Sequence, residues 1–207
     1  MHTVFSGKNK VTEEYHCQGG VLFAHTKITN KTVRIENTFC VFEKNQAIHL
    51  KLDVIYSIKL YSAGGCFYIV AAKAENTFNK GGFIISNKNS IFTNNVAYHY
   101  AGVLYLESKS KYQGVLRNIN CKFHGNSVGR EGACFYSKYL KRLFNVNVLF
   151  KENIAGSNGG IAGLWAVSSL ENMNCRFLNN RNGWEGHACS RTEWAKGSVF
   201  YIIREFG

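Results

Sequence analysis

The feature that most constrains this chain is a sequence motif that recurs at intervals of about 27 residues. It consists of a pair of small residues, an apolar run and then Phe-x-x-Asn. The Phe-x-x-Asn element occurs at Phe42 and Asn45, Phe92 and Asn95, Phe123 and Asn126, Phe150 and Asn153, and Phe177 and Asn180. The small pair occurs at Gly19-Gly20, Gly64-Gly65, Ala101-Gly102, Gly132-Ala133, Gly159-Gly160 and His187-Ala188. Such a repeat predicts a solenoid, in which each layer buries its apolar face only against its neighbours.

Apolar and polar residues alternate within each repeat. In residues 118–126 the apolar positions are Ile119, Cys121 and Phe123, and the positions between them are polar. This period of two predicts a strand with one buried face. A second strand is expected after each small pair, as at residues 103–106.

A coil of about 27 residues with three short strands and three turns is the unit of a parallel β-helix. The sequence therefore predicts an all-β parallel β-helix of about six to seven coils. The repeated Phe should form an internal aromatic stack, and the repeated Asn a ladder of side-chain amides that joins coil to coil.

We expect residues 1–207 to form a single β-helix domain. No sequence at either end is recognised as the cap that a solenoid end needs, so the chain is expected to be part of a longer one. Residues 46–63 are interpreted as an irregular inserted strand segment, and residues 75–82 as a loop insertion.

The chain has seven cysteines, and six of them occupy two positions of the repeat. Cys40, Cys121 and Cys175 precede the motif Phe by two residues, whereas Cys66, Cys134 and Cys189 follow the next small pair. Where the first position lacks Cys the second lacks it too, as at Ser90 with Val103 and Val148 with Ile161. This matching predicts contact across the turn and the disulfides Cys40–Cys66, Cys121–Cys134 and Cys175–Cys189, with Cys17 left over.

Three disulfides would place the protein in an oxidising compartment. The alternative is that the thiols are reduced and buried, and that they pack as small apolar residues. The sequence leaves both open.

The net charge of +12 is high for a chain of this size. A nucleic-acid-binding protein gathers its basic residues in a run or on one face. Here they are scattered, and only Lys141 and Arg142 are adjacent. We therefore do not expect nucleic acid as a partner. The charge suits a soluble basic exterior, or attraction to an acidic glycan or an anionic membrane surface. No apolar stretch approaches the roughly 20 residues of a membrane helix.

Catalysis has little support in the sequence. Glycosidic hydrolysis needs paired carboxylates, and calcium-dependent lyases need several around the metal. The only aspartate is Asp53, and the glutamates, among them Glu107 and Glu131, share no repeat position. No nucleophile signature accompanies any Ser or Cys. The adjacent His16 and Cys17, and His187-x-Cys189, lack the further ligands of a zinc site. We predict no catalytic, cofactor or metal site.

Aromatic residues cluster near the expected corners and are candidate glycan contacts: Tyr98, Tyr100, Trp165, Trp184 and Trp194. Exposed rings could stack on sugars, and a basic exterior would favour acidic glycans. The alternative for each ring is buried packing at a corner. The binding hypothesis requires that several of the rings lie along one sheet face.

The combination of a Gly-Gly-apolar turn with Phe-x-x-Asn, over residues 19–190, resembles the repeats of chlamydial polymorphic outer membrane proteins. Related repeats occur in large surface proteins of some protists. The resemblance implies a right-handed parallel β-helix of the pectin-lyase-like kind, displayed at a cell surface with adhesive or structural roles. The family's Gly-Gly-Ala-Ile becomes Gly-Gly-Val-Leu, Gly-Gly-Cys-Phe or Gly-Ala-Cys-Phe in this chain.

We therefore expect a non-catalytic structural or adhesive β-helix segment of a larger cell-surface or secreted protein, located outside the cell. The expected partners are acidic glycans or surface proteins, and no cofactor is expected. Two alternatives stay open. One is a carbohydrate-binding module for acidic glycans. The other is a polysaccharide-active enzyme of the same fold, which the scarcity of clustered carboxylates disfavours.

Overall fold

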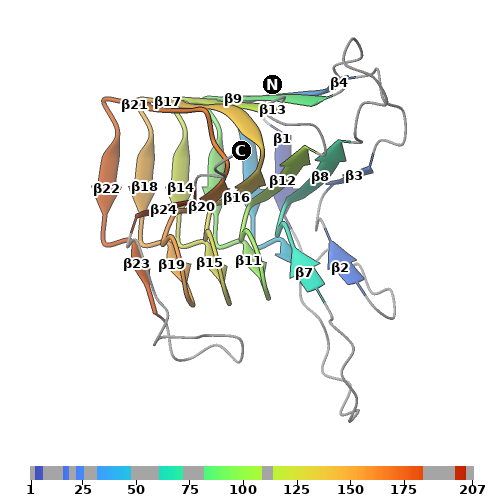
Figure 1. The fold of residues 1–207 in the computed structure, drawn as a ribbon. Helices are drawn as coiled ribbons and strands as arrows, with labels where there is room; N and C mark the ends of the chain where they lie inside the picture. The colour runs from blue at the N-terminus through green and yellow to red at the C-terminus, as the bar shows by residue number, and fades with distance from the viewer. Residues whose placement is uncertain are drawn as a thin grey trace.

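The computed structural model of this chain describes residues 3–6, 16–18, 22–25, 32–47, 61–71, 82–108, 114–183 and 199–203. Every secondary-structure element within these residues is a β-strand, and the strands stack into parallel sheets (Figure 1). Among the described residues there is no membrane-spanning helix.

Four parallel sheets run along the molecule, and each is named here for its composition or size. The Phe sheet contains, in spatial order, β1 (Thr3–Ser6), β5 (Cys40–Glu43), β10 (Ile91–Thr93), β14 (Lys122–His124), β18 (Leu149–Lys151) and β22 (Arg176–Leu178). The short sheet contains β6 (Gln46–Ala47), β11 (Val96–Ala97), β15 (Ser127–Val128), β19 (Ile154–Ala155) and β23 (Arg181–Asn182).

The other two long sheets complete each coil. The Tyr sheet contains β3 (Leu22–His25), β8 (Phe67–Ala71), β12 (Leu104–Ser108), β16 (Phe135–Lys138), β20 (Ala162–Trp165) and β24 (Phe200–Ile203). The Asn sheet contains β4 (Thr32–Thr38), β9 (Gly82–Lys88), β13 (Gly114–Ile119), β17 (Leu140–Val146) and β21 (Ser169–Met173). A separate two-stranded sheet pairs β2 (His16–Gln18) with β7 (Tyr61–Ala63).

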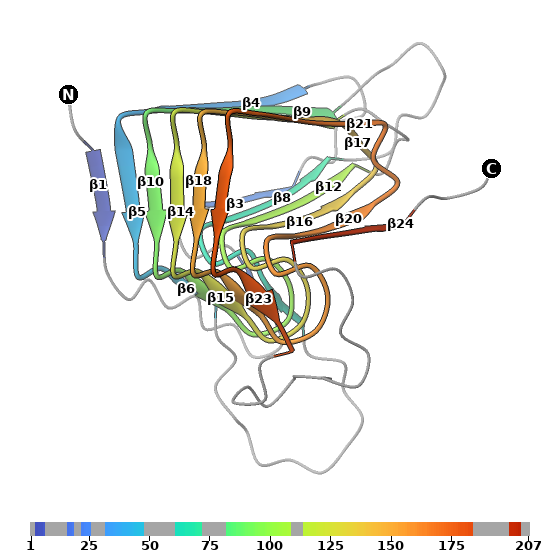
Figure 2. The same cartoon turned by 90° about the vertical axis from the view of Figure 1, so that its left-hand side faces the viewer.

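Each coil passes through the Asn, Phe, short and Tyr sheets in that order, as β9, β10, β11 and β12 do. The next coil places each strand beside its equivalent, so that Phe92 pairs with Phe42 on one side and with Phe123 on the other. This confirms the predicted all-β parallel β-helix. In Figure 2 the strands of the Phe sheet run side by side and meet those of the Asn sheet at a sharp corner.

Each coil has four strands, whereas the sequence predicted three. The apparent single strand at residues 118–126 is broken at Asn120, whose φ is 52°. Asparagine tolerates this left-handed conformation, which turns the chain by one corner and reverses the alternation. Asn118 is therefore buried and Ile119 only half-buried, while Phe123 stays in the core. The prediction that Ile119 faces the interior was wrong for this reason.

The motif Phe side chains form the predicted internal stack. Successive rings lie 4.7 to 5.3 Å apart between centroids, with interplanar angles of 14° or less. The stack follows from the register, because the strands that carry these residues pair with equivalent positions aligned. It forms the centre of the main core cluster.

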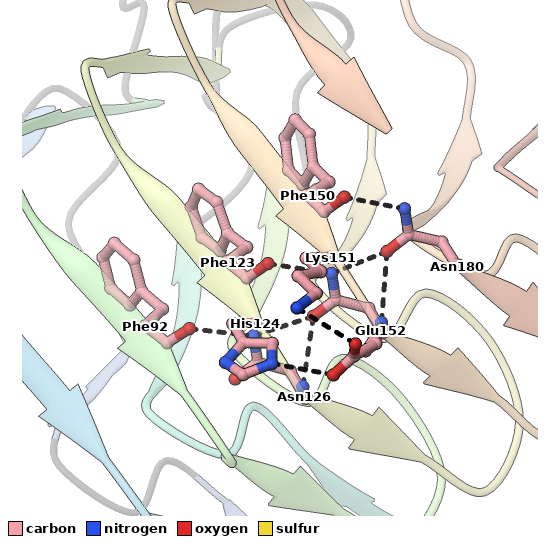
Figure 3. Close-up of polar contacts among 9 residues, drawn as sticks. Phe92, Phe123, His124, Asn126, Phe150, Lys151, Glu152 and Asn180 are labelled. Atoms are coloured by element: carbon pink, nitrogen blue, oxygen red, sulfur yellow. Dashed lines mark hydrogen bonds and ion pairs between the residues drawn. The ribbon is translucent and has the colours of Figure 1, made fainter. Parts of the chain in front are cut away.

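The motif Asn side chains form the predicted ladder, which is buried in its central coils (Figure 3). Each Nδ2 donates to the Oδ1 of the equivalent Asn in the next coil, at 2.8 to 3.0 Å from Asn45 to Asn180. The same Oδ1 accepts a backbone N–H of the previous coil, as Asn126 does from Asn95. Each Nδ2 also donates to a carbonyl oxygen of the previous coil's Phe, as Asn126 does to Phe92 at 3.0 Å. These bonds satisfy buried polar groups that would otherwise destabilise the fold.

A second amide ladder lies in the Asn sheet, and the sequence analysis did not predict it. It links Asn37, Asn87, Asn118, Asn145 and Asn172 at 2.7 to 2.8 Å. An exposed third row joins Asn89, Asn120 and Asn147 at the corner between the Asn and Phe sheets. The repeated asparagines thus hold equivalent positions of successive coils together at three places on the circumference.

The structure corrects the predicted disulfides. Cys40, Cys66, Cys121, Cys134 and Cys175 are all free thiols, and Cys189 lies outside the described residues. Both cysteine positions of the repeat belong to the main core cluster, in which Cys40, Cys66, Cys121 and Cys134 are buried and Cys175 is partly buried. The Cys121 thiol donates to the Ile119 carbonyl oxygen at 3.3 Å. The cysteines act as small apolar core residues, which was the alternative interpretation.

The irregular segments lie mostly outside the described residues. Of residues 46–63 the structure describes Gln46–Ala47 in β6 and Tyr61–Ala63 in β7, and of residues 75–82 only Gly82, at the start of β9. The separation between successive ladder asparagines is 50 residues from Asn45 to Asn95, then 31, then 27. The ladder therefore keeps its register although the coils differ in length.

Replacing Asn126 by Ala should lower the free energy of unfolding by about 3 kcal/mol or more, because several buried donors and acceptors lose their partner. Urea unfolding would measure the loss. Asn120→Gly is the matched control, since it removes an exposed amide and keeps a residue that accepts positive φ; its cost should stay below about 1 kcal/mol. Equal losses in the two variants would contradict the dominant role of the buried ladder.

The buried thiols should not react with iodoacetamide in the native protein. Burial raises the pKa of the Cys66 and Cys134 thiols well above the ordinary value and that of Cys121 to about 11, so the reactive thiolate is scarce at pH 8. Mass spectrometry after labelling with and without urea should find these three cysteines modified only in urea. A Cys121–Cys134 disulfide in non-reduced peptides would contradict the structure.

Candidate functional site

The outer side of the Tyr sheet carries a column of tyrosines. Tyr68, Tyr105 and Tyr136 occupy equivalent positions of β8, β12 and β16 and pair in register. Their rings stack with centroids 4.6 and 5.3 Å apart. They belong to a hydrophobic cluster separate from the main core, so aromatic packing extends beyond the interior of the coil.

The tyrosine column is interrupted at Gly163, which pairs with Tyr136 in β20. A Cβ atom at Gly163 would lie 3.2 Å from both Tyr136 Cδ2 and Glu131 Cβ. Because this is closer than side chains usually approach, the glycine leaves room for Glu131 beside the last ring of the stack.

A cavity of about 450 Å³ opens where the column is interrupted. Its lining residues are Tyr100, Tyr136, Lys138, Tyr139, Trp165, Ala166 and Ile203. We call this surface the aromatic groove. Its volume lies within the range of small-molecule sites, which are concave and largely apolar with a few polar groups.

The aromatic groove contains two of the five residues predicted as glycan contacts, Tyr100 and Trp165. Tyr98 does not line it, and its ring instead meets His99 edge-on at 4.8 Å. Trp184 and Trp194 lie outside the described residues. The sequence-based hypothesis thus identified part of one site.

Trp165 is fixed in the groove by a chain of hydrogen bonds. Its indole N–H donates to Glu131 Oε2 at 3.4 Å, and Asn158 Nδ2 donates to Glu131 Oε1 at 3.2 Å. Trp165 nevertheless keeps 37% of its surface exposed. The indole is therefore held in one orientation while much of it stays accessible.

Ionisable groups surround the tyrosine cluster. The Tyr105 hydroxyl donates to Glu107 Oε2 at 2.9 Å. Burial, followed by the nearby Glu107 carboxylate, raises the pKa of Tyr105 far above its ordinary value. Burial, followed by the Glu131 carboxylate, does the same to the pKa of Tyr136. Both phenols are thus neutral hydrogen-bond donors at physiological pH. Lys138 Nζ lies 5.9 Å from the centre of the Tyr136 ring, within reach of a cation–π interaction.

Sequence reasoning missed Tyr136, Lys138 and Tyr139 in the groove, and the role of Glu131. The tyrosine column did leave a signal, because Tyr68, Tyr105 and Tyr136 all follow the small pair at the same offset. The absence of a ring at Gly163 and the approach of Glu131 left no signal in the sequence, because both depend on how one coil lies against the next.

A second polar cluster lies on the Phe sheet, on the neighbouring coils of β14 and β18 (Figure 3). His124 Nε2 lies 2.9 Å from Glu152 Oε2, and Lys151 Nζ lies 3.2 Å from Glu152 Oε1. Hydrogen bonds from His124 and then Lys151 lower the pKa of Glu152 below its ordinary value. The groups are largely solvent-accessible, so the cluster is an ordinary surface ion network and does not define a binding site.

Within the described residues, no group of three or more His, Cys, Asp or Glu side chains is placed to hold a metal ion. The lining of the aromatic groove offers flat rings and one ammonium donor, and the Glu131 carboxylate lies beside it on the indole N–H of Trp165. This combination suits a ligand with apolar faces and several hydroxyl groups. No protein-family model, curated protein or solved structure matches the chain.

The contribution of the Glu152 cluster to the free energy of unfolding should be present at neutral pH and lost in acid. A carboxyl with a lowered pKa in the folded state stabilises the protein above its unfolded pKa, near 4.3, and the contribution is lost as the pH falls through the folded value. Urea unfolding of wild type and Glu152→Gln should therefore differ at pH 6 and converge towards pH 3. A difference that grows on acidification would contradict the assignment.

Proposed function

We propose that this chain is a non-catalytic β-solenoid segment with an adhesive role in a larger cell-surface or secreted protein. The observation that carries the proposal is the aromatic groove, in which accessible rings from several coils lie together on one outer face. Recognition of an extended ligand needs binding groups held at a fixed spacing. Coils that are hydrogen-bonded to one another in register provide such a spacing.

Rigidity of the framework supports the proposal. Two amide ladders and one Phe stack connect coil to coil, so the groups on the Tyr sheet repeat at the ordinary strand spacing of about 4.8 Å. Preformed sites lose less conformational entropy on binding than flexible ones do. A solenoid of this kind is thus suited to present binding groups without rearranging.

The proposed location at a cell surface rests on other observations than the adhesive role does. The free thiols remove the disulfides as an argument for an oxidising compartment. What supports the surface location is the similarity of the Phe-x-x-Asn repeats to those of polymorphic outer membrane proteins, together with the basic exterior. The location is therefore tested separately from adhesion, by protease treatment of intact cells of the source organism.

Binding of carbohydrate is the second candidate function, and the aromatic groove favours it specifically. Tyr100 and Trp165 bring two accessible rings to one cavity, and rings of this kind stack on the C–H faces of sugars. A polysaccharide-active enzyme is the remaining alternative. It would need two carboxylates placed on either side of a glycosidic bond.

Beads coated with the purified chain should adhere to surfaces carrying intact cells or immobilised glycans. Trp165→Ala should reduce adhesion several-fold, because it removes the accessible ring of the groove. Ile91→Ala, which truncates an exposed side chain on the Phe sheet, is the matched control and should adhere like wild type. Absence of adhesion to every surface would refute an adhesive role, and release of new reducing ends from a bound glycan would establish the enzyme alternative.

A further inference from the structure

The outer face of the Tyr sheet is a grid with three coils as rows and three positions as columns. Going from coil to coil, the first column holds Tyr100, Glu131 and Asn158, the second Tyr105, Tyr136 and Gly163, and the third Glu107, Lys138 and Trp165. Aromatic, acidic and amide groups thus alternate over this face. The kind of ligand that this face can bind depends on which of these side chains lie at the aromatic groove.

The exposed ring of Trp165 marks the position of the ligand. The indole lines the aromatic groove, keeps 37% of its surface exposed and is oriented by its bond to Glu131. The neighbouring position at Gly163 is filled by the Glu131 side chain, which lies against the buried Tyr136 ring. A flat sugar ring could therefore stack on the indole of Trp165.

The hydrogen-bonding groups around Trp165 suit hydroxyl groups. Glu131 receives Asn158 on one oxygen and Trp165 on the other. Each carboxylate oxygen has two lone pairs, so both can accept one further donor. Lys138, which lines the cavity, has three N–H donors. A polyol ring could therefore donate to the carboxylate and accept from the ammonium group.

The local charge differs from the charge of the whole chain. The chain carries +12, but the charged side chains of the grid are two carboxylates, Glu107 and Glu131, and one ammonium group, Lys138. An anionic ligand stacked on Trp165 would lie close to the Glu131 carboxylate that bonds this indole, and a like charge at short range opposes binding. The groove thus disfavours the acidic glycans that the net charge alone suggested.

We propose that the aromatic groove binds a neutral saccharide. One pyranose ring stacks on the exposed indole of Trp165 in the aromatic groove, and its hydroxyl groups donate to Glu131 and accept from Lys138. The inference rests on the proposed adhesive function and specifies its ligand. Attraction of acidic polymers to the basic exterior is then a separate, non-specific effect that salt removes.

Affinity electrophoresis provides the test, because it detects weak binding as retardation in a gel that contains polysaccharide. The neutral probes are xyloglucan, glucomannan and galactan, and the acidic probes are polygalacturonate and alginate, all at an ionic strength of about 0.15 M. At least one neutral polymer should retard wild type. Trp165→Ala should weaken this retardation about ten-fold or more, and Glu131→Gln several-fold.

Matched variants separate loss of the site from loss of the fold. Trp165→Phe keeps a ring but loses the bond to Glu131, so its affinity should lie between those of wild type and Trp165→Ala. Ile91→Ala should bind like wild type. Circular dichroism and urea unfolding identify any variant that fails to fold. If Trp165→Ala fails to fold, the inference is tested by the retardation of Glu131→Gln relative to wild type.

The result that would overturn the inference is distinguishable from failure of adhesion itself. If Trp165-dependent retardation occurs only with acidic polymers, the groove is an adhesive site but its ligand is not a neutral saccharide. If the neutral polymers retard wild type and Trp165→Ala equally, the groove is not the binding site. If no polymer is bound while coated beads still adhere to cells, the adhesive role stands and the saccharide is excluded.

Discussion

The structure depends on the buried side-chain amide of asparagine, which recurs from coil to coil in two separate ladders. A buried amide without partners destabilises a fold, whereas an amide with equivalents above and below satisfies its donors and acceptors. Asn126 is bonded on both sides in this way, to Asn95 and to Asn153. This requirement fixes the register between coils more strictly than apolar packing does, because a shift by one residue would leave every amide in the column without its partner.

Once the register is fixed, the outer faces follow from it. Coil lengths differ because residues are added between the strands, while the ladder positions stay aligned. Each outward column is therefore determined by the sequence at one offset from the motif. The tyrosine column, the Gly163 gap and the position of Trp165 are consequences of this alignment, so the framework and the aromatic groove have the same physical origin.

The repeat made the architecture predictable. Phe123 and Asn126 recur at constant offsets, and such recurrence admits few arrangements other than stacked coils. The corner at Asn120 was not predictable from alternation, because a left-handed residue changes which side faces inward without changing the hydrophobic pattern. The cysteine pattern identified two positions that both belong to the main core cluster, but the disulfides that it predicted are absent among the described cysteines. The groove depends on contacts between coils, such as Glu131 with Trp165, which one sequence does not reveal.

The two buried amide ladders also share a direction. In both, the amide nitrogen of one coil donates to the oxygen of the coil that follows it in sequence, from Asn45 towards Asn180 and from Asn37 towards Asn172. The amide dipoles therefore add along the axis, and the two ends of the rod are chemically unlike. The donor end of each ladder is left with an amide N–H to offer, and the acceptor end with an amide oxygen. Contact between the acceptor end of one copy and the donor end of another would continue both ladders, whereas contact between two like ends would set donor against donor or acceptor against acceptor.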